Sequence, residues 1–208
     1  MRTRLLGLFA VSLLVVPGVA QKRAAAVKEA SFADAVAAAT KAFDAKEYGA
    51  AITALQNAIR AVQKLQRVAI LAALPQPAGF TVRDDEARED EGMPGFATMA
   101  ALGLTVGRHY EQADKRIDTE VLANSPMVAM VAMMLANPAL VQADGGEVVE
   151  YGKHKALLKK SGDTGHELTI VLFDKHLVKA TCEGMTADDL LVVFDQATVD
   201  RLEKALGN

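Results

Sequence analysis

The chain has 208 residues, of which 51% are hydrophobic and 5% aromatic, and its formal charge is −3. This hydrophobic share is sufficient for a packed core and excludes a wholly disordered chain. The acidic balance argues against nucleic acid as a partner, because phosphate contacts need a basic face. Cys182 is the only cysteine, so no disulfide can form within the chain.

Residues 1–20 have the pattern of a secretory signal peptide. Arg2 and Arg4 precede the apolar run 5–16, and small residues follow up to Ala20. The run is shorter than the ~20 apolar residues of a membrane-spanning helix. We expect cleavage after Ala20, which removes two arginines and no acid and leaves 188 residues with a charge of −5. Retention of the segment as an uncleaved anchor is the alternative.

Residues 24–74 predict a helical hairpin, because they contain one glycine and no proline and carry two apolar stripes at helical spacing. The end of this segment, residues 68–74, is apolar on nearly every side, so the rest of the protein or a partner must cover it. The first stripe consists of Phe32, Val36, Ala39 and Phe43, and the second of Ile52, Leu55, Ile59 and Val62.

The turn of this hairpin resembles a tetratricopeptide unit. The run Ala42-Phe43-Asp44-Ala45-Lys46-Glu47-Tyr48-Gly49-Ala50-Ala51-Ile52, continued through Leu55, Ala58 and Ile59, has the small residues and the turn tyrosine of that family over about residues 42–61. Stacked units of this family form a peptide-binding groove, and at least three are needed for a continuous core. Only one unit is present here, so the resemblance implies an αα-hairpin without the groove. A generic alanine-rich hairpin is the alternative.

Residues 75–97 predict an acidic linker. Pro75, Pro77 and Gly79 end the helix, and Gly92, Pro94 and Gly95 close the segment. The stretch between them, residues 83–91, contains six acidic and two basic side chains.

Residues 98–208 predict an α+β domain with an antiparallel sheet of about six strands, in the order ββαββββα. A β-hairpin is expected over residues 98–123, and Ser125-Pro126 begins a helix that runs to about residue 136. Four strands follow, over residues 147–151, 153–160, 166–173 and 176–184. A two-residue turn at Asp174-Lys175 would pair Phe173 with His176. Thr186 and Asp189 predict the cap of a last helix, which Asp195 restarts as a second segment.

This domain resembles the PsbP-like domains in its layout. The resemblance depends on the Val148-Val149 strand, the turn at Gly152 into His154-Lys155-Ala156-Leu157, and the Leu177-Val178 strand before the last helix. It implies a compact α-β-α sandwich of an extracytoplasmic protein, and such domains are mostly binding or assembly modules without catalytic residues.

The expected helix 126–136 is unusually rich in methionine. Met127, Met130, Met133 and Met134 are three or four residues apart, a spacing that could hold copper(I) in an exported protein. Val128, Val131 and Leu135 fill the other faces, which predicts instead a helix that is apolar and buried all round. An apolar ligand pocket along this helix is a further alternative.

The sequence predicts no catalytic, cofactor or metal site. The four histidines have no metal-ligand spacing, Cys182 lies inside a strand, and Ser125 is placed as a helix cap. Six lysines gather on the later strands, either as a solvated sheet edge or as a surface for an anionic partner or for the acidic linker. They are Lys153, Lys155, Lys159, Lys160, Lys175 and Lys179.

Taken together, these patterns predict an exported, non-catalytic binding or assembly module of the bacterial cell envelope, periplasmic or secreted. Its expected partner is another envelope protein; nucleic acid is not expected, nor is a membrane span after signal cleavage. The alternatives are a carrier of copper(I) or of a small apolar ligand on the methionine helix, and an enzyme of unrecognised type.

Overall fold

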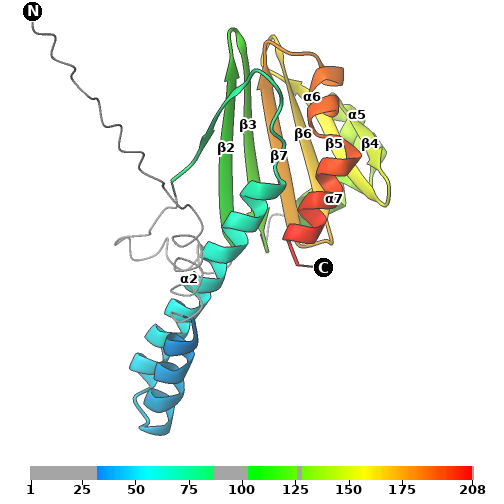
Figure 1. The fold of residues 1–208 in the computed structure, drawn as a ribbon. Coiled ribbons are helices and arrows are strands. Elements are labelled where there is room, and N and C mark those ends of the chain that lie inside the picture. The colour runs from blue at the N-terminus through cyan, green and yellow to red at the C-terminus, as the bar shows by residue number, and fades with distance from the viewer. Residues whose placement is uncertain (1–31, 87–102, 126–127, 208) are drawn as a thin grey trace, which may run out of the picture. The chain divides into compact units, whose positions relative to one another are not determined.

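The computed structural model describes residues 32–86, 103–125 and 128–207 (Figure 1). The expected signal peptide, Pro126, Met127 and the second half of the expected linker lie outside these ranges. The chain divides into two units with the boundary between Val62 and Gln63.

The first unit is a helix pair, as the sequence predicts. Residues 32–44 form one helix, and a short turn that contains Lys46 at a φ of 63° leads into α2, Tyr48–Ala73. The second half of α2 already belongs to the other unit.

The second unit contains one antiparallel sheet of seven strands in the order β1-β2-β3-β7-β6-β5-β4. The α+β class is therefore confirmed, with one strand more than expected. Each strand pairs with a neighbour in sequence except where β3 pairs with β7. The strands are β1 (Thr81–Asp84), β2 (Leu104–Gln112), β3 (Lys115–Ala123), β4 (Gly146–Tyr151), β5 (His154–Ser161), β6 (Gly165–Leu172) and β7 (His176–Glu183).

One face of the sheet is covered by α6 (Ala187–Val193) and α7 (Gln196–Ala205), which Figure 1 shows in front of the strands. Leu190, Phe194 and Leu202 are fully buried against the inward side chains of the strands. The caps are those that the sequence predicts. The Thr186 hydroxyl and the Asp189 carboxylate each accept the other's backbone N–H, and the Asp195 side chain caps α7.

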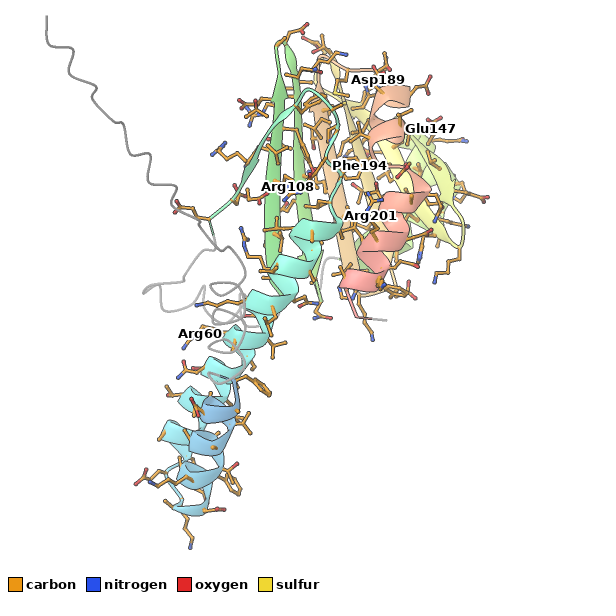
Figure 2. The ribbon with its side chains drawn as sticks, viewed as in Figure 1. Arg60, Arg108, Glu147, Asp189, Phe194 and Arg201 are labelled. Atoms are coloured by element: carbon orange, nitrogen blue, oxygen red, sulfur yellow. The ribbon has the colours of Figure 1, made fainter. Side chains whose placement is uncertain are left out.

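The apolar end of α2 packs in the same core. Ile70, Ala73 and Leu74 are buried with the strands, and the Arg201 guanidinium of α7 donates to the Ala73 carbonyl at 3.2 Å (Figure 2). The sheet unit therefore covers three of the residues 68–74, which the sequence predicts to be covered by the rest of the protein or by a partner. Val68 remains 54% exposed.

Of the described elements, only two helices cover the opposite face of the sheet, and they cover half of it. The helices α4 (Val128–Leu135) and α5 (Pro138–Ala143) pack their buried residues Val131 and Val141 on Leu157 and Leu177. The same face of β2 and β3 carries polar side chains, described below.

Two predictions about the sheet are wrong. The segment expected as linker contains β1, which pairs with β2 through Val82 opposite Tyr110. The turn between β6 and β7 has three residues instead of the expected two. Leu172 is paired with His176, and Phe173 and Asp174 between them both have φ near 54°. Since side chains alternate along a strand, this one-residue shift changes every cross-strand partner in the hairpin.

Candidate binding surface

The contact between the two helices of the first unit is made by alanines. Ala39 of the first helix and Ala51, Ala54 and Ala58 of α2 are at most 9% exposed. Side chains this small let two helices approach closely, so the seam buries little more than methyl groups.

The large apolar side chains lie outside this seam. The sequence predicts two apolar stripes, and such stripes would be expected to form the contact between the helices. In α2, Ile52, Leu55 and Ile59 each follow a buried alanine and are 50–57% exposed. The α2 stripe has the helical spacing that the sequence predicts, but its side chains face the surface.

Both helices turn these side chains to the same side of the pair. A step of one residue rotates a side chain by about 100° around the helix. Val36 and Phe43 follow the half-buried Ala35 and Ala42, as the α2 residues follow their alanines. In antiparallel helices the same rotation away from a shared seam leads to the same side. We call this surface the apolar face; its members are Phe32, Val36, Phe43, Tyr48, Ile52, Leu55, Ile59 and Val62.

The apolar face contains no charged side chain. Phe43 and Tyr48 meet edge to face at the turn, with ring centroids 5.9 Å apart. On the opposite side of α2, Arg60 donates to the Asn57 side chain and the Thr53 hydroxyl donates to the Gly49 carbonyl at 3.1 Å. The helix pair is therefore amphipathic as a whole.

A second candidate surface is the uncovered half of the sheet, where His109 of β2 lies between two carboxylates. Its Nδ1 is 2.5 Å from Asp118 and its Nε2 is 2.7 Å from Asp85. These hydrogen bonds, that to Asp118 first, raise the pKa of His109. Burial alone would raise the pKa of Asp118, but the bonds from His109 and Arg116 lower it overall. A shallow hollow of about 270 Å³ adjoins the cluster and extends to Lys179.

The hydrogen bonds of this cluster have a structural role. When His109 is protonated, both ring nitrogens donate to carboxylates, so no lone pair is left for a substrate proton or a metal ion. Gly107 leaves the space that Asp85 occupies, since a Cβ there would collide with its carboxylate. The cluster thus ties the residue after β1 to the sheet.

On the helix-covered face, Asp84 fastens the same strand to Arg108. The Asp84 carboxylate accepts from Arg108 Nε at 2.5 Å and from Nη2 at 3.1 Å. Burial raises the pKa of the neighbouring Tyr110 to about 12. In the described part of the chain, Arg108 Nη1, the Tyr110 hydroxyl and the Thr119 hydroxyl are buried without a hydrogen-bond partner. The sequence does not predict that Asp84 lies in a strand, because proline, glycine and other acidic residues surround it.

The six lysines do not form one surface. Lys155, Lys159 and Lys179 lie on the half-covered face, Lys160 lies on the other face, and Lys153 and Lys175 lie in turns. Carboxylates accompany three of them. Lys153 Nζ is 3.1 Å from Glu203 Oε1, and Lys179 Nζ is 2.8 Å from Glu167 Oε2. Lys159 Nζ lies between the carboxylates of Glu167 and Asp144.

The expected pairing of the acidic segment with these lysines does not hold for its first two acids. Asp84 and Asp85 contact Arg108 and His109 instead. Glu89, Asp90 and Glu91 lie outside the described residues.

The methionine helix is buried on one side only. Val128, Val131 and Leu135 are buried, whereas Met130 is 56% and Met133 is 71% exposed, so the prediction of burial all round is wrong. The half-buried Met134 lies one turn from Met130, and Met127 lies outside the described residues. A cavity of about 610 Å³ opens beside α5, between Val141 and Val148.

The remaining candidate residues are separated from one another. Cys182 lies inside a strand, β7, as predicted; it is buried, and burial raises the pKa of its thiol. His154 contacts Glu203, and His176 Nδ1 accepts the Asn124 backbone N–H at 3.2 Å. Within the described ranges, no group of three or more His, Cys, Asp or Glu side chains is arranged to hold a metal ion.

Comparisons with known proteins give no relative: no family model, curated protein or solved structure matches the chain. None of the helices in the described ranges is long and apolar enough to cross a membrane.

Proposed function

We propose that the chain is a non-catalytic assembly module that docks an α-helical protein partner on its apolar face. The observation that carries this proposal is the set of eight large apolar side chains, each 39–62% exposed, on one side of the helix pair. Contiguous apolar patches above a few hundred Å² are rare on monomeric proteins and mark sites of interaction.

The charge of the helix pair favours a protein over a lipid surface. Residues 32–62 carry three basic and three acidic side chains. Helices that lie on anionic membranes usually have an excess of Lys and Arg on the polar face. The stripes instead follow the three- and four-residue spacing by which one helix packs on another.

The titratable clusters of the sheet support a non-catalytic role. His109 binds Asp85, Arg108 binds Asp84, and Cys182 is a buried thiol. Export to the bacterial cell envelope is proposed from residues 1–20. The resemblances to a tetratricopeptide hairpin and to PsbP-like domains agree with a binding or assembly role.

Site-specific photo-crosslinking in the native host tests the proposal. A benzoylphenylalanine in place of Leu55 should give a crosslinked product with an identifiable protein. The same residue in place of Asn57, on the opposite side of α2, should give none. Equal crosslinking from both positions, or none from position 55, would contradict the proposed docking surface.

A carrier of copper(I) is a second candidate, favoured by the exposed thioethers of Met130 and Met133 on one side of α4. Thioethers are soft ligands that suit copper(I). A titration of the protein with copper(I) should then show tight binding that the double substitution Met130→Leu and Met133→Leu removes. Unchanged binding in the double variant would exclude this site.

A further inference from the structure

The two stripes of the apolar face have the repeat of a helical bundle. On α2, Ile52, Leu55, Ile59 and Val62 are separated by three, four and three residues. On the first helix, the exposed members Phe32, Val36 and Phe43 are separated by four and seven residues, and the alanine between them lies in the seam. This heptad spacing places side chains as knobs in the holes of a facing helix. A pair of helices with such stripes on one side is half of a four-helix bundle.

We propose that the other half is a second copy of the same helix pair, so that two chains assemble through a four-helix bundle. This inference rests on the proposed function and names the partner of the same surface. The alanine seams become the contacts within each layer, and the large side chains of the apolar face become the contacts between the layers.

The area of the apolar face matches what a stable dimer requires. Its eight side chains are 39–62% exposed. With about 150–200 Å² for each when fully exposed, the face presents about 700 Å². Two copies would then bury about 1,400 Å², within the range of about 1,200–2,000 Å² for specific protein complexes.

The chemistry of the face also suits self-association. In a two-fold interface the same patch meets itself, so any charge near the axis would meet a like charge. Leu55, near the middle of the α2 stripe, is surrounded along that stripe by Ile52 and Ile59. A charge-free apolar centre therefore satisfies the symmetry without any complementary partner surface.

The test is the mass of the mature chain, measured by sedimentation from about 0.1 to 100 μM, a range that covers typical dimer affinities. We expect a dimer whose dissociation constant rises at least about 100-fold in Ile59→Glu, as for the centre of an interface. The matched control Asn57→Glu adds the same charge to the opposite side of α2 and should leave the dimer unchanged. Ile59→Ala keeps helix propensity, and circular dichroism checks its helix content; it should weaken the dimer by a smaller factor.

The outcomes separate this inference from the proposed function. A dimer that Ile59→Glu and Ile59→Ala leave intact uses another surface and overturns the inference. A monomer at all concentrations also overturns it. If that monomer binds the dye ANS and Ile59→Glu abolishes the binding, the face is open and the docking function stands. If the monomer binds no ANS, the face is covered within the chain and the proposed function fails as well. Dye binding together with adsorption to neutral lipid vesicles would identify a membrane surface instead.

Discussion

Asp84 and Asp85 are consecutive residues whose side chains fasten one short strand on both faces of the sheet. Asp84 binds Arg108 on the helix-covered face, and Asp85 binds His109 on the open face. All four residues of β1 are exposed, so burial contributes little to its position. The strand is therefore held by its backbone pairing and by these two ion pairs, and one of them depends on pH.

Replacement of His109 should change how stability depends on pH. The folded protein raises the pKa of His109. Its contribution is therefore fully present below the unfolded value of about 6.5 and is lost as the pH rises through the folded value. In His109→Gln we expect a loss of a few tenths to about 1 kcal/mol near pH 5.5, and a smaller loss at high pH. Urea unfolding at both pH values measures this, with His166→Gln as the control. An equal loss at both pH values would contradict the assignment.

At the scale of elements, the sequence predicts the helices and strands that have a strong local signal. The Thr186–Asp189 capping box is present, and the alternation of Ile117, Thr119 and Val121 gives β3 its buried side. What the sequence does not specify is which neighbour a side chain meets. The stripe of α2 has the correct period, but small alanines one position away allow a closer seam, so Ile52 and Ile59 face outward. The ion pairs of β1 join residues 24 positions apart, a distance that no local pattern encodes.

The helix α4 provides a direct test of one such orientation. Met130 is 56% exposed, whereas the adjacent Val131 is 9% exposed and packs on the sheet. Met130→Lys should therefore change the free energy of unfolding by no more than about 0.5 kcal/mol, as for ordinary surface substitutions. Val131→Lys buries an unpaired charge and should cost about 3 kcal/mol or more. Chemical denaturation of the two variants measures both effects. Comparable losses in the two variants would mean that Met130 is also in the core.

At the scale of the whole molecule, α2 belongs to both units. Its first half supplies the apolar face, and its last turns supply Ile70, Ala73 and Leu74 to the core of the sheet unit. Among the described residues, the sheet unit draws no core residue from before Gln63.

This division predicts different results for two truncations. A chain that begins at Gln63 keeps every described residue of the sheet core, so it should unfold cooperatively and stay monomeric where the longer chain dimerises. A chain that begins at Pro75 lacks Ile70 and Leu74, and Arg201 loses the Ala73 carbonyl. Removal of two large buried side chains should cost about 4 kcal/mol or more, a large part of the stability of a domain this size. Thermal unfolding and sedimentation of both fragments measure these effects. A fragment from Gln63 that fails to fold would show that the helix pair is part of the sheet core.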